Sequence, residues 1–266
     1  MTASSPAAAL EPFLADPGAA AVLCDLDGTL APIVDRPDRA RVPGRVRVAL
    51  ARIAGRYALA AVVSGRRAED ARAIVGLEEL TYVGNHGFEL LLPRAPAPRP
   101  APALGPRASA AADFAARLER SGLERSGLRL EDKGAIVALH WRGAVDERGA
   151  EAAAERIAAA AAAAGLVVHR GRKVLELRPA ASVDKGTAIE ALVEGGGASV
   201  ALYAGDDRTD LDGFAALDRL VASGRLRTAL RVGVASAEGP PEIAERADLT
   251  VASPAELVPL LVALAG

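Results

Sequence analysis

The stretch AAVLCDLDGTL, residues 20–30, joins a short apolar run to a turn that carries two acidic side chains. The run 20–25 is typical of a parallel strand that is buried on both faces. Because ligands of open parallel sheets bind at the carboxyl ends of the strands, we expect Asp25 and Asp27 to lie at a binding site. Residues two apart share a face of an extended chain, so both carboxylates can point at the same site.

Two neighbouring carboxylates repel each other unless a cation or a shared proton lies between them. A divalent metal meets this need, and the hard cation Mg²⁺ prefers such oxygens. Gly28 lets the chain turn and bring backbone N–H groups close to an anion. An acidic turn without a ligand is the alternative, but its place at a strand end favours a functional site.

Strand and helix patterns alternate around this stretch. The runs 59–63 and 81–83 predict buried strands, and helical spacing occupies 44–56 and 68–75. The rhythm resumes after residue 184, with helices expected at 185–194, 209–221 and 254–264 and strands at 200–204 and 231–234. This alternation predicts an α/β fold with a Rossmann-like parallel sheet covered by helices on both faces.

A different pattern interrupts this core after the proline-rich stretch 93–106, which is typical of extended chain. Two helix–strand–strand units follow: helix 108–120 with strands 128–131 and 136–141, then helix 147–164 with a hairpin of 166–169 and 173–177. We therefore predict a core of residues 1–105 and 180–266 and an inserted α+β cap at residues 106–179.

The composition is that of a globular chain of 266 residues with a formal net charge of -2. This charge favours neither a nucleic acid nor a membrane surface as partner, and no apolar stretch is long enough to predict a membrane span. The single cysteine, Cys24, excludes an internal disulfide and fits a reducing, cytoplasmic setting. Lysine is rare among the basic residues, and its positions are Lys133, Lys173 and Lys185.

Further polar motifs stand at the other strand ends and helix starts. Ser64-Gly65-Arg66 ends the second strand, where a hydroxyl and N–H groups can hold a phosphoryl oxygen, although an ordinary turn explains this motif alone. Lys185 begins a helix, against the preference of the helix dipole, which makes sense if its ammonium faces an anion. A solvated helix start is an equal alternative for Lys185.

Three carboxylates, Asp206, Asp207 and Asp210, follow the strand at 200–204. They can complete an oxygen shell for a cation. A solvated turn in which Asp207 or Thr209 caps the next helix is the alternative. Because all four acidic, hydroxyl and basic motifs fall at predicted strand ends or helix starts, together they indicate a site far more strongly than any one alone.

The order DLDGTL, SGR, DKG and GDDRTD resembles that of the haloacid-dehalogenase superfamily of phosphatases, and the insertion resembles that of members with an α/β cap. Within this superfamily the chain is similar to the trehalose-6-phosphate phosphatases over nearly its whole length. The motifs that carry this resemblance are YVGNHG at 82–87, EDKG at 131–134, HWR at 140–142, GRKVLELRP at 171–179 and YAGDDRTD at 203–210. Trp141 and Leu211 depart mildly from the pattern, which has a tyrosine and an acidic residue there.

The resemblance implies hydrolysis of trehalose 6-phosphate, with Asp25 as the nucleophile that forms an aspartyl phosphate. Asp27 would protonate the leaving sugar oxygen and then activate water. The implied cofactor is Mg²⁺, held by Asp25, the Asp27 backbone carbonyl and Asp206, with support from Asp207 and Asp210. The implied phosphate-binding residues are Leu26, Gly28, Ser64, Gly65 and Lys185. The implied substrate-binding residues are Arg66, Asn85, His86, Glu131, Lys133, Arg142, Lys173 and Glu176.

Several alternatives stay open from the sequence. His86 can equally be a structural loop histidine, and the charged residues of the insertion can be surface charges. The substrate can be sucrose 6-phosphate or a glycosyl-phosphoglycerate, the reaction can be a phosphoryl transfer between sugars as in a mutase, and a non-catalytic sugar-phosphate sensor is a further candidate. The family is often fused to or partnered with a synthase; the 266 residues carry no such domain, so we expect a free-standing enzyme and a separate trehalose-6-phosphate synthase as the candidate partner.

Overall fold

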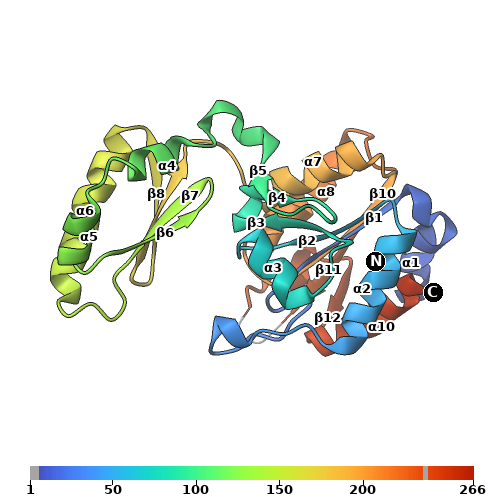
Figure 1. Ribbon diagram of the computed structural model, residues 1–266. Coiled ribbons are helices and arrows are strands. Elements are labelled where there is room, and N and C mark those ends of the chain that lie inside the picture. The colour runs from blue at the N-terminus through green and yellow to red at the C-terminus, as the bar shows by residue number, and fades with distance from the viewer. Residues whose placement is uncertain (1–5, 236–238) are drawn as a thin grey trace. The chain divides into compact units, whose positions relative to one another are not determined.

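The computed structural model describes residues 6–235 and 239–266, which form two compact units (Figure 1). The first unit comprises Met1–Pro98 and Val183–Gly266, and the second comprises Arg99–Ser182. The second unit contains the predicted insertion 106–179 and extends beyond it at both ends. Residues 1–5 and 236–238, which fall in the predicted core, lie outside the described residues.

The first unit is built on a sheet with the strand order β12-β11-β10-β1-β2-β3-β4. Its strands are β1 (Ala20–Asp25), β2 (Leu59–Val63), β3 (Thr81–Gly84), β4 (Glu89–Leu91), β10 (Val200–Gly205), β11 (Thr228–Val234) and β12 (Leu249–Val251). Every pairing from β12 to β3 is parallel, and β4 is antiparallel to β3. Each residue of β1 and β2 is buried, as expected of strands covered on both faces. The predicted α/β core with an inserted α+β unit is confirmed.

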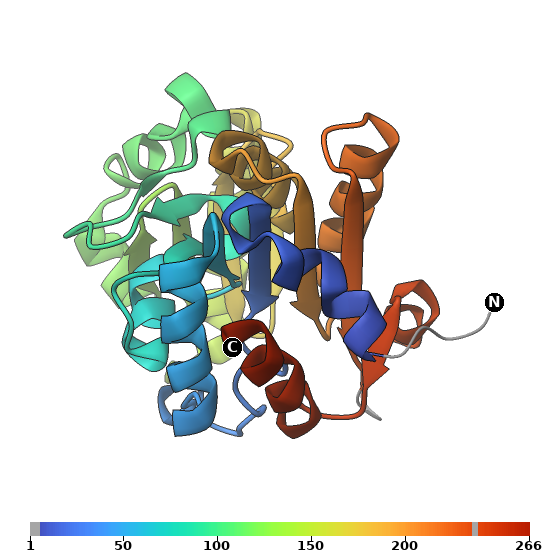
Figure 2. The ribbon, with the colours of Figure 1, turned by 90° about the vertical axis from the view of Figure 1, so that its right-hand side faces the viewer.

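Helices cover both faces of this sheet (Figure 1). One face packs against α1 (Pro6–Ala15), α2 (Gly44–Arg56), α3 (Ala68–Val75) and α10 (Pro254–Ala265). The other face packs against α7 (Lys185–Gly196), α8 (Asp210–Ala222) and α9 (Glu242–Arg246). Figure 2 shows α1 and α10 close to each other on the first of these faces, in blue and dark red.

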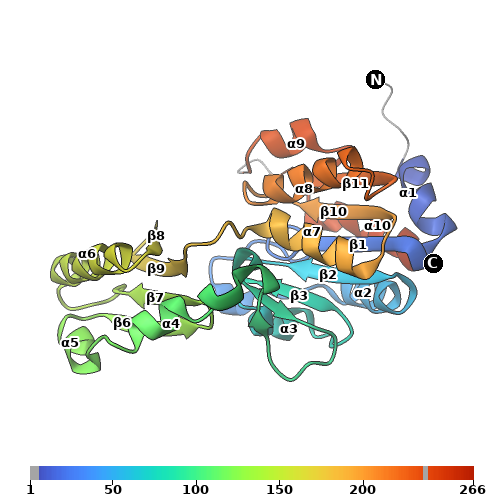
Figure 3. The ribbon, with the colours of Figure 1, turned by 90° about the horizontal axis from the view of Figure 1, so that it is seen from above.

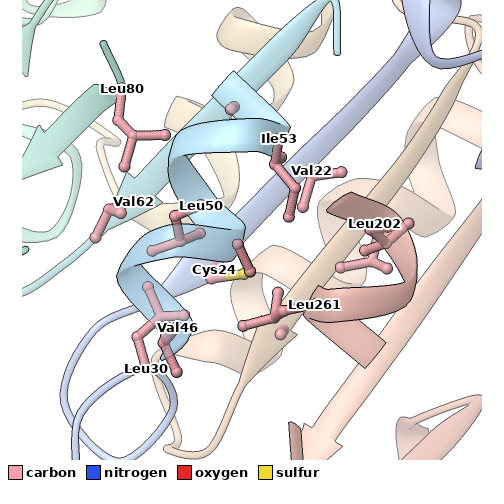
Figure 4. Packing of buried hydrophobic residues seen from close by; sticks show 14 of the residues in the cluster. Val22, Cys24, Leu30, Val46, Leu50, Ile53, Val62, Leu80, Leu202 and Leu261 are labelled. Atoms are coloured by element: carbon pink, nitrogen blue, oxygen red, sulfur yellow. The ribbon is translucent and has the colours of Figure 1, made fainter. Parts of the chain in front are cut away.

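The alternation of side chains along β1 decides which residues enter which half of the core. Val22 and Cys24 face the layer of α2 and α10, whereas Ala21 and Leu23 face the layer of α7 and α8. Figure 4 shows the first layer, in which Val22 and Cys24 lie among side chains of α2 and α10. Apolar packing on both faces holds the carboxyl end of β1, and therefore Asp25, in place.

The second unit pairs a sheet of order β6-β7-β9-β8 with three helices (Figure 3). Its strands are β6 (Arg129–Lys133), β7 (Ile136–His140), β8 (Leu166–Gly171) and β9 (Val174–Pro179), all paired antiparallel. Its helices are α4 (Ala110–Ala115), α5 (Arg120–Arg125) and α6 (Glu147–Ala163). Leu139, Leu175 and Leu177 pack on one face of the sheet with the alanines of α6, which leaves the other face to polar side chains.

The remaining elements are short. They are the 3₁₀ helices η1 (Pro17–Ala19), η2 (Pro37–Arg39), η3 (Asn85–Gly87) and η4 (Pro102–Arg107) and the two-residue strand β5 (Arg99–Pro100).

The structure differs from the sequence prediction at several elements. The extent of the helix predicted at 108–120 is wrong: α4 ends at Ala115, and α5 begins only at Arg120. Between them, Glu119 has an extended backbone, and its carboxylate accepts a hydrogen bond from the Ser121 hydroxyl. The hairpin of β8 and β9 turns at Arg172-Lys173, because β8 runs to Gly171 rather than ending at the predicted residue 169, and Lys173 has a left-handed φ of 62°. Elements α1, β4, α9 and β12 were not predicted, because they are short or lack a clear period.

We expect Ile53→Ala to lower the free energy of unfolding by about 2–5 kcal/mol, because this fully buried side chain fills the layer between α2 and the sheet. The matched control is Val48→Ala on the same helix, where the side chain is 57% exposed and the expected change is about 0.5 kcal/mol or less. Urea unfolding followed by circular dichroism measures both. Equal losses in the two variants would contradict this account of the core.

Candidate active site

The register of the parallel strands gathers the polar motifs at one edge of the first unit's sheet. Asp25 lies opposite Val63, and Cys24 lies opposite Ala204. Ser64 and Asp206 directly follow these paired segments, so the ends of β1, β2 and β10 meet at this edge. The sequence prediction that the motifs share one end of the sheet is consistent with this register.

Lys185 stands at the centre of this edge. Its ammonium donates to Asp25 Oδ1 and to Asp210 Oδ1, each at 2.7 Å, and its side chain is only 2% exposed. The helix start is capped separately by Asp184, whose carboxylate accepts from the Thr187 N–H at 2.7 Å. Burial alone would lower the pKa of Lys185, but the facing carboxylates of Asp25 and Asp210 raise it above its usual value. Lys185 is therefore a buried cation bound to carboxylates, and a solvated helix start is excluded.

Three carboxylates lie close together at this edge, and two of them bind the Lys185 ammonium. Oxygens of Asp25, Asp206 and Asp210 lie within 4.8 Å of one another, and all three residues are buried. Burial raises the pKa of Asp25; the Lys185 ammonium opposes this rise, and Asp210 and Asp206 add to it. Burial also raises the pKa of Asp206 to about 7, although the Thr29 hydroxyl donates to its Oδ1 at 2.9 Å. The excess of buried negative charge and the all-oxygen donor set fit a hard divalent cation.

Asp210 already has donors at both of its oxygens. Oδ1 accepts from Lys185 and from the Tyr203 hydroxyl. Oδ2 accepts from the backbone N–H groups of Asp206 and Asp207 at 2.9 and 3.0 Å. Asp210 therefore holds the loop after β10 in shape, which leaves Asp25 and Asp206 as the carboxylates better placed to contact a cation.

Asp207 lies at the rim of the cluster. Its side chain is 53% exposed, and its Oδ1 accepts from the Thr209 N–H at 2.8 Å and from the Thr209 hydroxyl at 2.7 Å. These contacts are those of the capping turn that the sequence left open as an alternative. The same Oδ1 lies 3.9 Å from the Lys185 ammonium, so Asp207 also adds negative charge to the cluster.

Arg66 binds Asp27 through a two-pronged ion pair, with Nε to Oδ2 at 2.6 Å and Nη2 to Oδ1 at 2.7 Å. The sequence placed Arg66 on the substrate and did not predict this pair. The hydrogen bond that Arg66 donates to Asp27 raises the pKa of Arg66, burial opposes the rise, and Asp25 contributes a smaller rise. The Ser64 Oγ accepts from the Arg66 N–H at 3.1 Å, so the residues after β2 reach the acidic turn after β1.

Position 28 requires a glycine for two reasons: a side chain would clash with Asp206, and the backbone is left-handed. Its φ is +91°, and a Cβ at this position would lie 2.0 Å from Asp206 Oδ2. Its N–H donates to the Ala31 carbonyl at 2.8 Å, which differs from the expectation that this group faces an anion. The Leu26 side chain lies in the apolar core, so a phosphate contact from Leu26 would come from its backbone.

Asn85 and His86 lie directly beside the Ser64 loop. Both have left-handed backbones, with φ of 50° and 57°, which is strained for residues other than glycine. The Asn85 N–H donates to the Arg66 carbonyl at 2.7 Å, and the His86 N–H donates to the Ser64 carbonyl at 3.0 Å. A Cβ on Gly65 would lie 2.5 Å from His86 Cε1, so the imidazole occupies the space that glycine leaves.

The second unit brings three of its predicted residues onto one sheet face. Glu131 and Glu176 lie in register with Ala138 between them. The Lys133 ammonium donates to Glu176 Oε1 at 3.1 Å. Two further predicted residues lie outside the strands. Arg142 follows β7 and donates to the Arg172 carbonyl at 3.3 Å, and Lys173, in the turn before β9, pairs with Glu147 at 2.6 Å.

Several contacts of the site were missed by the sequence prediction. The residues are Thr29, Tyr203 and Glu89 in the first unit and His140, Glu147 and Arg178 in the second. Thr29, Tyr203, His140 and Arg178 stand inside the quoted motifs, which was the available signal. Glu89 is buried, accepts from the Ala68 N–H at 3.0 Å and has its pKa raised by burial, and only the structure shows this role.

Within residues 6–235 and 239–266, no helix combines the length and the apolar character that crossing a membrane requires.

Comparison with known proteins gives a consistent result. The family model described as trehalose-phosphatase matches residues 23–254. The chain is 40% identical over 210 residues to the trehalose-phosphate phosphatase of Mycobacterium avium, covering 74% of this chain and 51% of that protein. It is 36% identical over 203 residues to probable trehalose-phosphate phosphatase 4 of Oryza sativa, covering 73% and 54%. The chain thus spans about half the length of these curated relatives.

A solved structure described as a trehalose-6-phosphate phosphatase related protein matches with a TM-score of 0.65 at 25% identity. The match covers 92% of this chain and 96% of that one. The resemblance drawn from the motifs is therefore confirmed at the level of both sequence family and fold.

Without divalent cations, we expect the thermal unfolding temperature to decrease as the pH is raised from 5 to 8. The pKa of Asp206 in the folded state, about 7, lies above its ordinary value. The contribution of Asp206 to the free energy of unfolding is therefore full at low pH and is lost as the pH rises through 7. Added Mg²⁺ should raise the unfolding temperature more at pH 8, where the carboxylate is free of its proton. Differential scanning calorimetry at both pH values, with EDTA or Mg²⁺, measures this.

The control for that measurement is Asp206→Asn, which keeps the shape of the side chain and removes its charge. This variant should reduce both the fall with pH and the gain from Mg²⁺. A gain from Mg²⁺ that is unchanged in Asp206→Asn would rule out Asp206 as a residue that holds the cation.

Proposed function

The chain belongs to the trehalose-phosphatase family, and from this premise we propose that it hydrolyses trehalose 6-phosphate to trehalose and inorganic phosphate. The observation that carries the proposal is the environment of Asp25. Its carboxylate stands at the end of a buried parallel strand, 2.7 Å from the Lys185 ammonium and beside the carboxylates of Asp206 and Asp210. This combines a nucleophilic oxygen with positive charge at the edge where ligands of such sheets bind.

In the first chemical step, an oxygen of Asp25 attacks phosphorus, and the bond from phosphorus to the sugar oxygen breaks. Charge in phosphoryl transfer is spread over the equatorial oxygens, so the nearby Lys185 ammonium stabilises it. The Ser64 hydroxyl follows the neighbouring strand and is proposed to donate to the same phosphoryl group. An aspartyl phosphate on Asp25 results, and water then hydrolyses it.

Asp27 is proposed as the acid for the leaving sugar oxygen and as the base for the water. The guanidinium of Arg66 donates to both oxygens of the Asp27 carboxylate, at 2.6 and 2.7 Å, and fixes its orientation. In the first step Asp27 gives its proton to the leaving sugar oxygen, and in the second step the carboxylate that remains accepts a proton from the attacking water, which restores the starting form. Arg66 is thus proposed to orient Asp27, in addition to the substrate contact that the sequence suggested for it.

Mg²⁺ is the cofactor that we propose, held by Asp25 and Asp206 and the backbone carbonyl of Asp27. When bound, it would neutralise negative charge on the phosphoryl oxygens and on the buried carboxylates. Asp210 and Asp207 would keep the loop after β10 in place through their hydrogen bonds. The proposed phosphate site also includes Leu26, Gly28 and Gly65. Leu26 would contribute its backbone, and the two glycines lack a Cβ that would collide with Asp206 or His86.

The second unit is proposed to recognise the disaccharide. Glu131, Lys133 and Glu176 place acceptors and donors on one sheet face, which is the chemistry that sugar hydroxyls require. Arg142 and Lys173 are proposed as further donors, as are Asn85 and His86 of the first unit. A different sugar phosphate, such as sucrose 6-phosphate, remains the nearest alternative substrate.

The proposed setting is cytoplasmic, which the single, buried Cys24 supports. A separate trehalose-6-phosphate synthase that supplies the substrate is the proposed partner, and it rests on the family resemblance alone.

We expect phosphate release from trehalose 6-phosphate to exceed release from sucrose 6-phosphate and glucose 6-phosphate by at least about tenfold in kcat/KM, because unpaired polar groups penalise the wrong sugar. Release should require Mg²⁺ and stop in EDTA. Preference for another sugar phosphate would discard the sugar assignment and keep the chemistry. Tight binding of trehalose 6-phosphate without release would favour the sensor.

Asp25→Asn should abolish turnover, because the amide cannot act as the nucleophile. The isosteric control is Asp38→Asn on the exposed Arg36–Asp38 pair, which should retain full activity. Substantial turnover in Asp25→Asn would refute the assignment of the nucleophile.

Arg66→Gln should lower kcat by about tenfold or more, because Asp27 loses the bidentate guanidinium contact that orients it. The neighbouring Arg67→Gln is the matched control, since Arg67 pairs with Glu69 instead, at 3.4 Å, and it should change kcat by less than about twofold. Steady-state kinetics with trehalose 6-phosphate measures both. An unchanged kcat in Arg66→Gln would show that the Arg66–Asp27 pair has no part in the chemistry.

A further inference from the structure

One face of the second unit's sheet carries a polar side chain from each of its four strands. The register places Glu131, Ala138, Glu176 and His169 in a single row across β6, β7, β9 and β8. Because residues in one row share a face, their neighbours two positions along each strand, including Lys133 and Arg178, lie on it too. Leucines occupy the opposite face and pack on α6, so one face forms the core of the unit and the other presents polar side chains.

Glu176 lies at the centre of this face and is bound by two cations. Lys133, from β6, donates to Oε1 at 3.1 Å. Arg178, two residues along β9, donates to Oε2 from Nη2 at 2.6 Å and from Nε at 3.2 Å. The exposed fractions of the Lys133, Glu176 and Arg178 side chains are 18%, 16% and 19%, so the three charges are largely withdrawn from water.

The charges around Glu176 decide its protonation state. Burial raises the pKa of Glu176, but Arg178 and Lys133 lower it by more, so the net pKa lies below the usual value. Glu176 is therefore ionised at neutral pH and can only accept hydrogen bonds. A carboxylate held from both sides also has little rotamer freedom left to lose when a ligand binds.

We propose that Arg178 is a positioning residue for sugar recognition: its guanidinium fixes the Glu176 carboxylate as an oriented acceptor for a hydroxyl of the disaccharide. This role rests on the proposed function of the second unit, and it belongs to a residue to which the sequence motifs gave no role. Lys133 cannot replace Arg178 in this task, because it approaches the other oxygen and its ammonium lacks the planar fork. His140 offers a parallel on the same face, since its Nε2 lies 2.7 Å from Glu131 Oε2.

Arg170 provides a matched control within the same sheet. It also binds a glutamate through a two-pronged pair, with Nε and Nη2 at 2.9 and 2.7 Å from Glu155. Arg170 lies on β8, one residue along from His169, so it is on the opposite face of the sheet from Glu176. Arg170→Gln thus removes a similar ion pair from the same unit without touching the polar face.

The test is steady-state kinetics with trehalose 6-phosphate on the full chain. Arg178→Gln should raise KM about tenfold and change kcat by less than about twofold, because an oriented acceptor is lost and the chemical groups stay intact. Arg178→Lys should recover only part of the loss, and Arg170→Gln should leave KM unchanged. An unchanged KM in Arg178→Gln overturns the proposal.

A double-mutant cycle decides whether Arg178 acts through Glu176. In a Glu176→Ala background, adding Arg178→Gln should change KM by less than about twofold, because the group that Arg178 orients is gone. A full tenfold effect in that background would mean that Arg178 acts independently of Glu176 and would overturn the positioning role. Thermal unfolding of Arg178→Gln and Arg170→Gln, compared side by side, shows whether stability loss accounts for the kinetics.

A substrate-free measurement separates this proposal from the proposed function. The carboxyl carbon of Glu176, followed by NMR over a pH titration, should show a higher pKa in Arg178→Gln and the wild-type value in Arg170→Gln. This result is expected whichever sugar phosphate the wild-type protein hydrolyses. An unchanged Glu176 titration in Arg178→Gln overturns the proposal even if trehalose 6-phosphate is the substrate, whereas absent turnover in the wild type counts against the proposed function alone.

Discussion

The buried ammonium of Lys185 is the contact on which the rest of the candidate site depends. A charge that is withdrawn from water must be paired, and Lys185 is paired with Asp25 and Asp210 at 2.7 Å each. Through Asp210 the same network reaches Tyr203 and the backbone after β10, and through Asp25 it reaches the end of β1. Helix α7 and strands β1 and β10 are thus joined by charge as well as by apolar packing. Since Lys185 is separated from Asp25 by the whole inserted segment, the site forms only when both parts of the first unit have folded together.

The two units handle charge in different ways. In the first unit, three carboxylates and one ammonium are buried together, so their charges do not balance and a further cation is favoured. In the second unit, both oxygens of Glu176 are paired with cations, Lys133 and Arg178, on a face that retains some contact with solvent. The carboxylate cluster suits the binding of a cation, which would in turn stabilise a reacting phosphate, and the ion-paired Glu176 suits the recognition of neutral hydroxyls. This division agrees with the proposed roles of hydrolysis in the first unit and sugar recognition in the second.

At four motif positions the backbone is crowded or left-handed, which explains why these positions carry glycine, asparagine or histidine. Gly28 must be glycine because a Cβ would collide with Asp206, and Gly65 must be glycine because the His86 imidazole takes its place. The left-handed pair Asn85 and His86 is held by hydrogen bonds to the Ser64 loop, so its strain is offset by the contacts that position it. These three loops belong to one arrangement, in which each limits the conformation of the next.

Local patterns in the sequence were sufficient for the parallel core, the inserted α+β unit and the family, because buried strands read as continuous apolar runs and polar residues at their ends meet at one edge. The same patterns singled out Asp25, Asp206 and Lys185 as candidates, since each stands in a motif at a strand end or helix start, and the structure brings these three together. They failed where structure depends on distant partners: the break between α4 and α5, the antiparallel strand β4 and the ion pairs Arg66–Asp27 and Arg178–Glu176. Sequence by itself determined which residue types are present and which elements carry them. Only the tertiary structure decided which charge faces which, because that follows from strand register and burial, and these arise when segments far apart in the chain pack together.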